Sequence, residues 1–345
     1  QEETKMSDEK ALQRPILDRV RDALDENGCL PDDFQLEGPL EEGQIGFAPG
    51  AMDGIIMYHS GGGANKQLLA KLQDVTTQVA AGLDFDEAEA RLAAVFAERA
   101  NSQAKPERRL VSNYDEMLVC IDGLHEWILA NKEQIDPNTM MDFALRLLHT
   151  TSSVGAVKYA LSLLELLSET TGAWRGLVRD LSACDEFTLY GVFVARNWEN
   201  ASDELWQMAK RVDGWGRVHA VAELEPENQE MREWLLDDGW RNRVMPAYSA
   251  LQCAVKGGLA GRLKQQELTD GQFEAATGLL AGLLDEGPVA GISRIDGPAG
   301  LLTAYLEHAG RHNLGDDDRR LLADIAGLAE ACGWQQVQDL AQALL

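Results

Sequence analysis

The fold is decided by three copies of one short pattern: Asp185-Glu186-Phe187, Asp213-Gly214-Trp215 and Asp238-Gly239-Trp240. In each copy an acidic turn precedes an aromatic residue, and an apolar run with helical spacing follows. The aromatic residues stand 28 residues apart (187 to 215) and then 25 residues apart (215 to 240). A recurrence at this interval is typical of repeat proteins, in which one supersecondary unit is used again and again.

Helical periodicity extends from Lys66 to Leu345, where apolar residues recur at intervals of three and four. Glycine, proline or Asp/Asn clusters interrupt this pattern every ten to twenty residues, so the central helices should be only about 10 to 14 residues long. Asp136-Pro137, for example, predicts the start of a helix. Four-helix bundles need longer helices, whereas recurring short antiparallel pairs are typical of solenoids. The sequence therefore predicts an all-α fold.

Two stretches resemble HEAT-type helical repeats. They are Asp213-Gly214-Trp215-Gly216-Arg217-Val218-His219-Ala220-Val221-Ala222 and Asp238-Gly239-Trp240-Arg241-Asn242-Arg243-Val244-Met245-Pro246-Ala247, and Val157-Lys158-Tyr159-Ala160-Leu161 is similar to the second half of such a unit. In both long stretches the basic residue precedes the valine instead of following it, and Pro246 is expected to kink its helix. The resemblance implies a right-handed α-solenoid of short antiparallel helix pairs, and it carries no chemistry by itself.

The repeated triplet also has a physical rationale. An aspartate at the turn is expected to cap the following helix, a glycine relaxes the backbone, and a tryptophan fills the wedge between neighbouring helix pairs. Burial of one tryptophan contributes roughly 2 to 3 kcal/mol. Stability alone therefore accounts for Trp215 and Trp240.

Composition limits the classes of partner. The chain has 345 residues with a net charge of −26, from 57 acidic and 31 basic residues. Such a chain repels phosphate backbones and anionic lipids, so we expect no direct binding of nucleic acid and no membrane association. The five cysteines are widely spaced and include no CxxC, which favours isolated thiols in a reducing compartment. We therefore expect a cytoplasmic protein. Residues 1–5, which precede Met6, are interpreted as an addition from expression.

The sequence divides into two predicted regions. Residues 1–65 form an acidic N-terminal helix with a Gly/Pro-rich loop or cap, and 66–345 form the helical-repeat domain. Residues 1–60 hold 14 acidic and 5 basic residues. A first helix is expected from Leu12 to about Asn27 with Gly28 as its stop, followed by a β-hairpin that pairs 44–47 with 54–58.

Residues that carry chemistry are few. No Walker loop, HExxH, GxSxG or EF-hand pattern occurs. His308 and His312 lie four residues apart, but Gly310 stands between them and no acid–His arrangement beside them completes a metal site. We expect no catalytic residue, metal or cofactor. The glycine-rich stretch 60–66 is either a flexible hinge or an anion site at a helix N-terminus. The loop before it carries Phe47, Met52, Asp53, Tyr58 and His59, which would serve a partner site or a cap equally well.

A second candidate surface lies in the repeats. Six of the eight tryptophans fall within 174–240, and tryptophan dominates many binding interfaces. Trp206 and Trp234, with Glu204, Glu230 and Glu233 beside them, are candidates for partner contact.

The working hypothesis is a non-enzymatic module that binds another protein. The acidic charge favours a basic partner, and an inhibitor or immunity-type protein is one concrete form. Two alternatives stay open. One is an enzyme or small-molecule binder at 47–66, with Asp53 and His59 as acid–base candidates, and the other is a structural scaffold that oligomerises.

Overall fold

The computed structural model describes residues 11–38, 45–103, 110–111, 115–167 and 172–345. Within these ranges the protein is all-helical, as predicted, apart from one two-residue parallel pairing of β1 (Ile45–Gly46) with β2 (Leu110–Val111). The chain forms two compact units, 1–204 and 205–345. No helix among the described residues combines the length and the apolar character that a membrane crossing requires.

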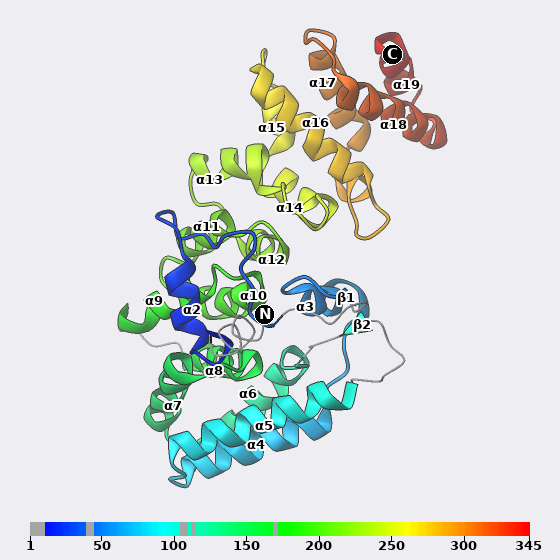
Figure 1. Cartoon of the computed structure of the whole chain (residues 1–345). Helices are drawn as coiled ribbons and strands as arrows, with labels where there is room; N and C mark the ends of the chain where they lie inside the picture. The colour runs from blue at the N-terminus through cyan, green and yellow to red at the C-terminus, as the bar shows by residue number, and fades with distance from the viewer. Residues whose placement is uncertain (1–10, 39–44, 104–109, 112–114, 168–171) are drawn as a thin grey trace, which may run out of the picture. The chain divides into compact units, whose positions relative to one another are not determined.

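The first unit contains nine helices for which bounds are defined among its described residues: α2 (Ile16–Ala23), α3 (Ala51–Ile55), α4 (Lys66–Ala80), α5 (Phe85–Gln103), α6 (Ile121–Ala130), α7 (Pro137–Thr150), α8 (Val154–Leu166), α9 (Arg175–Leu181) and α10 (Asp185–Ala195). Short pieces accompany them: a π-helical turn (Ile56–Ser60) and 3₁₀ turns at Leu118–Cys120 and Gly172–Trp174. Among these described helices, three pairs adjacent in sequence pack together, namely α4 with α5 (Figure 1), α7 with α8 and α9 with α10.

The second unit continues the same style of packing. Residue 204, the last of the first unit, lies within α11 (Ala201–Arg211). After α11 the second unit contains α12 (Trp215–Glu223), α13 (Gln229–Trp234), α14 (Ala247–Gly257), α15 (Leu259–Arg262), α16 (Asp270–Leu284), α17 (Pro298–Ala309), α18 (Asp316–Cys332) and α19 (Gln335–Leu344). A π-helical turn spans Leu235–Gly239 and a 3₁₀ turn spans Ile292–Arg294. The central helices have the short lengths that the periodicity predicts.

The core of the first unit lies around α8. Every residue of α8 from Gly155 to Leu164 is buried, because α7, α10, α5 and α6 all pack against it. Gly155 allows α5 to approach closely, since a Cβ there would lie 2.4 Å from the ring of Phe96. A helix buried on all sides is expected to be apolar all round. Lys158 is the one charged residue of this stretch, and its side chain is only 1% exposed.

The predicted β-hairpin is wrong. Gln44 lies outside the described residues, Ile45–Gly46 pairs with Leu110–Val111, and 54–58 is helical in α3 and the π-helical turn after it. The β-branched Ile55 and Ile56 favour a strand locally, but Gly50 adopts φ 73° and opens a helix at Ala51. That helix turns Asp53 into the core, so tertiary packing overrides the local preference.

The capping role predicted for the triplets is also wrong. The cap position of α12 is Gly214, without any side-chain cap bond, and Asp213 forms an ion pair of 2.6 Å with Arg243. The third triplet ends a helix instead of starting one, because Asp238 and Gly239 close the π-helical turn and α14 begins only at Ala247. The wedge role fits better, since Trp215 and Trp240 are 7% and 6% exposed.

A buried arginine explains why the third triplet ends a helix. The Nε of Arg217 donates to the carbonyls of Ala209 and Val212, near the end of α11, at 3.0 and 2.8 Å. Its Nη1 donates to the carbonyl of Arg241 at 2.9 Å. One guanidinium thus satisfies carbonyls that two helix ends leave without partners.

The first helix is shorter than predicted. It runs from Ile16 to Ala23, and Gly28 has the left-handed φ of 75° that the predicted stop requires. Arg19 reaches from this helix to the loop after it, because its Nη2 donates to the carbonyls of Gln35 and Leu36 at 2.7 and 2.9 Å. The loop is therefore folded back on α2.

Candidate binding segment and its buried ionic anchor

The candidate site is residues 45–60, which we call the binding segment. Three large apolar side chains on it are exposed: Ile45 at 61%, Phe47 at 38% and Met57 at 50%. The three lie within 13 consecutive residues, and a contiguous group of exposed apolar side chains marks an interaction surface. The sequence singled out Phe47, and the structure adds Ile45 and Met57.

The binding segment is held by a buried cluster of charges, which we call the ionic anchor. The Nζ of Lys158 lies 2.9 Å from a carboxylate oxygen of Asp53, 3.0 Å from Asp115 and 2.6 Å from Glu186. The other oxygen of Asp53 accepts a bond of 3.4 Å from the Tyr190 hydroxyl. One lysine on α8 thus joins α3, the segment before α6, and α10.

Backbone bonds fix the remaining carboxylate oxygens of the ionic anchor. The second oxygen of Glu186 accepts the N–H of Gly50 at 2.6 Å, so the start of α3 is bonded to α10. Asp115 accepts the N–H of Met117 at 2.8 Å with its other oxygen. The anchor therefore specifies the conformation of the chain on both sides of it.

The protonation state of the ionic anchor follows from its excess of three carboxylates over one lysine. Burial raises the pKa of Asp53 to about 7, with Asp115 and Glu186 acting in the same direction and Lys158 opposing them. Burial alone would lower the pKa of Lys158, but the charges of Asp115, Asp53 and Glu186 raise it well above its usual value. Because one lysine serves three carboxylates, one of them is close to taking up a proton at neutral pH.

The other residues singled out in 47–59 have different environments. Asp53 is 2% exposed and belongs to the ionic anchor, whereas His59 is exposed on the π-helical turn. Met52 and Tyr58 are half-buried. The structure therefore brings Asp53 to Lys158, and it leaves the proposed acid–base pair of Asp53 and His59 as one buried and one exposed group.

The glycine-rich stretch leads directly into a capped helix. Asn65 is the N-cap of α4, and its side-chain oxygen accepts the N–H groups of Gln67 and Leu68, both at 3.1 Å. These are donors that an anion would use at a helix N-terminus. The hinge interpretation of 60–66 fits this arrangement better than the anion site.

The second set of candidate residues is mostly packed. Trp206 is 7% exposed, with the Nζ of Lys210 at 3.8 Å from its ring centre and the half-buried Trp234 at 6.4 Å, edge to face. Glu204, in the first unit, is 5% exposed and bonded by Arg179. Glu230 and Glu233 are exposed on α13.

The two histidines at helical spacing, His308 and His312, contact different residues. His308 is buried and bonds the Leu263 carbonyl at 3.0 Å, while His312 lies 3.0 Å from Asp270. Among the described residues no group of three or more His, Cys, Asp or Glu side chains has the arrangement of a metal site. None of the five cysteines forms a disulfide; Cys332 is exposed and Cys29 is half-buried.

Sequence reasoning missed Lys158, Asp115 and Glu186 as members of one cluster. The available signal was Lys158 itself, the single charge in the mostly apolar run Val154–Leu164. A charge in such a position must be paired if it is buried. Its partners are 28 to 105 residues away, so the sequence alone could not name them.

Comparison with known protein families, curated proteins and solved structures found no match for this chain. The functional argument therefore rests on the residues and their geometry.

Proposed function

We propose that this chain is a non-enzymatic module that binds a basic protein partner through the binding segment and the acidic surface of the first unit. The observation that carries the proposal is the exposure of Ile45, Phe47 and Met57 on a segment that the ionic anchor bonds at Gly50 and Asp53. A preorganised apolar surface binds with a smaller loss of conformational entropy. Within this proposal, an inhibitor or immunity-type protein of the cytoplasm is one concrete form.

The charge distribution supports a basic partner. Residues 1–204 carry 36 acidic and 18 basic side chains, while 205–345 carry 21 and 13. Most of the negative excess thus belongs to the unit that contains the binding segment. Complementary charge accelerates association and disfavours wrong partners.

We also propose that the helices form a HEAT-like α-solenoid. Helices pack against their neighbours in sequence, as α7 does on α8 and α18 on α19, and against the next but one, as α14 does on α16. This contact pattern supports stacked helix pairs. A solenoid would present an extended surface to a protein partner.

An affinity-capture experiment tests the proposed function. The immobilised wild-type chain and the double variant Phe47→Ser, Met57→Ser are exposed to lysate of the source organism at about 0.1 M and about 1 M salt, between which the Debye length falls from about 10 to about 3 Å. We expect a basic protein that the wild type retains at low salt and that the double variant loses. Leu129→Ser is the matched control, since Leu129 is 56% exposed on α6. Capture of an acidic protein that persists at high salt would refute the charge argument.

The catalytic alternative has one observation in its favour. A carboxyl whose pKa is raised to about 7, as that of Asp53 is, resembles a general acid or base. Both oxygens of Asp53 are, however, engaged by Lys158 and Tyr190, and the residue is 2% exposed. Turnover that Asp53→Asn abolishes without unfolding the chain would favour this alternative. The scaffold alternative predicts self-association, which light scattering measures.

A further inference from the structure

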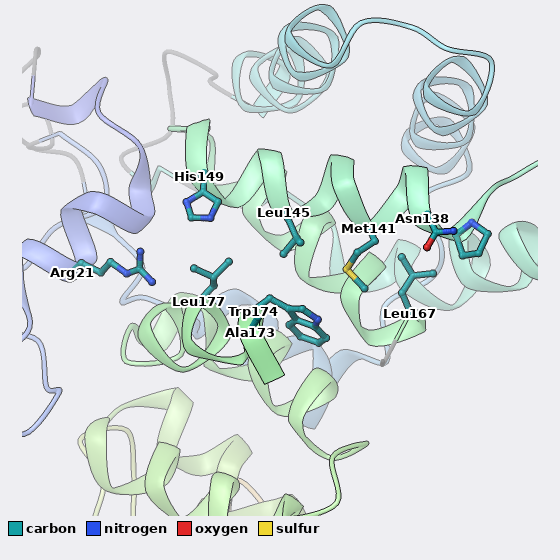
Figure 2. A pocket seen from close by; sticks show the side chains of 10 residues that line it. Arg21, Asn138, Met141, Leu145, His149, Leu167, Ala173, Trp174 and Leu177 are labelled. Carbon is teal, nitrogen blue, oxygen red and sulfur yellow. The ribbon is translucent and has the colours of Figure 1, made fainter. Parts of the chain in front are cut away.

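A groove in the first unit lies apart from the binding segment. It has a volume of about 780 Å³ and is lined by α7, Leu167 just after α8, the 3₁₀ turn Gly172–Trp174, Leu177 of α9 and Arg21 of α2. Figure 2 shows Met141 and Leu145 of α7 facing Trp174 and Leu177 across it. These side chains make an apolar floor, and Met141 and Leu145 are half-buried and so partly reachable from solvent.

The groove is the continuation of a space that already holds a helix. α2 packs against both α7 and α9 and buries Ile16, Leu17 and Val20 there. Arg21, in the last turn of α2, then lines the groove, which extends along α7 to Asn138 (Figure 2). The space between α7 and α9 thus holds one helix at α2, and beyond α2 it continues as an apolar groove that no helix fills among the described residues.

The length of the groove and the side chains at its two ends indicate the length and the charge of a molecule that would fit it. From Asn138 to His149 the groove follows about three turns of α7, or roughly 16 Å at 1.5 Å per residue. Its charged end carries Arg21 and His149, both exposed, whereas Asn138 at the far end is neutral. The Arg21 Nε donates to Asp180 at 2.7 Å. A guanidinium has five N–H donors, so beside this bond to Asp180 Arg21 can donate to a second carboxylate, and His149 adds a ring nitrogen at the same end.

We propose that this groove binds an amphipathic helix of a partner protein, about three turns long, with an apolar stripe at positions i, i+3, i+4 and i+7 and an acidic residue at the end beside Arg21 and His149. This is the helix-in-groove mode of peptide recognition. An enclosed cavity would instead favour a small molecule, since such sites bury most of their ligand, and this groove is open to solvent along α7. The inference does not depend on the binding segment.

Two synthetic helical peptides test the proposal with the full-length chain. Both have 14 residues and leucine at positions 4, 7, 8 and 11; one carries glutamate at both ends, and its twin carries lysine there. Fluorescence anisotropy of the labelled peptides should show saturable binding, with the glutamate peptide binding about two- to fivefold more tightly, as expected for a partly exposed charge contact. Equal or tighter binding of the lysine peptide would overturn the proposed charge.

Two variants locate the binding in the groove. Leu145→Glu places a charge on the floor and should weaken binding at least about tenfold. Ala173→Trp fills the groove from an exposed position, so it tests the site without altering the core. Val255→Glu is the matched control, because Val255 is 60% exposed and lies in the second unit. Circular dichroism verifies that each variant is folded.

Three results would overturn the proposal. They are the absence of saturable binding by either peptide, equal binding to wild type and to the folded Ala173→Trp variant, and saturable binding of dodecanoate in the groove without binding of either peptide. The last result would assign the groove to a small amphiphile instead of a helix.

Discussion

Replacement of Lys158 by methionine is the most direct test of the ionic anchor. Methionine retains much of the volume of lysine but removes the charge, so Asp53, Asp115 and Glu186 lose their shared counterion. Two of these carboxylates are nearly inaccessible to water, at 2% and 6% exposure, and Glu186 is 22% exposed. Removal of one partner from a buried ion pair costs about 3–5 kcal/mol. We expect a loss of that size at pH 8.

The loss should depend on pH in a defined direction. The pKa of Lys158 is raised in the folded protein, so its stabilising contribution is fully present below the unfolded value near 10.4. In the variant the three carboxylates can relieve their repulsion by taking up protons. The destabilisation should therefore shrink as the pH falls from 8 to 5, since neutral carboxyl groups no longer require the lysine.

Hydrogen exchange measured by mass spectrometry is the appropriate assay, because two units need not unfold together. In Lys158→Met, peptides that cover 50–60 and 154–166 should lose protection first. Lys71→Met is the matched control: Lys71 pairs with Glu98 at 2.6 Å on the surface, where both side chains are largely exposed, and its loss should cost less than about 1 kcal/mol. Unchanged protection of 50–60 in Lys158→Met would refute the idea that the ionic anchor holds the binding segment.

Three further predictions concern single residues. The pKa of Asp53 is raised to about 7 in the folded chain, so between about pH 4 and 7 the folded state retains a proton that the unfolded state releases. The wild type should therefore lose up to about 4 kcal/mol of stability as the pH rises from 4 to 7. Asp53→Asn should abolish this pH-dependent loss. The difference between the urea unfolding curves of variant and wild type measures this, and parallel pH profiles would contradict it. Arg19→Met should speed hydrogen exchange in 29–36, because the donors to Gln35 and Leu36 are lost, at a cost of about 1.5–3 kcal/mol; unchanged exchange would mean that other contacts hold the loop. Trp206→Ala should lower the free energy of unfolding of the second unit by about 3–5 kcal/mol, whereas a loss of partner binding at unchanged stability would restore Trp206 as a contact residue.

The helical character of the chain was predictable because it depends on the local spacing of apolar and capping residues. The stripe Leu68, Leu72, Val75 and Val79 is buried along α4. Asp136 caps α7 by accepting the N–H of Thr139 at 2.9 Å, with Pro137 in the first turn. Both features depend on residues a few positions apart, so one sequence is enough to read them.

The errors arise where distant residues decide the local conformation. Ile55 and Ile56 favour a strand, yet the pairing of Asp53 with Lys158, 105 residues away, fits a helix at this point. Asp238 was expected to start a helix, but Arg217 reaches across 21 residues to the carbonyl of Asp238 at 3.4 Å. Such pairings have no local signal.

The candidate site was predictable only where a local sequence signal exists. Phe47 stands out because an aromatic residue in a loop rich in glycine and proline has few local partners. The groove along α7 has no counterpart in the sequence, since α2, α7 and α9 meet only in the folded unit. Leu145 and Met141 read as ordinary core positions of an amphipathic helix, and only the structure reveals that they are half-exposed.

The ionic anchor also imposes an order of events during synthesis. Gly50 leaves the ribosome 136 residues before Glu186, the side chain that bonds its N–H. At about 5–20 residues per second, the binding segment waits roughly 7–27 s for that partner. During this interval the apolar side chains of Ile45, Phe47 and Met57 have no fixed support. Nascent chains therefore pass through a stage in which chaperones can compete for the surface that we propose for the partner.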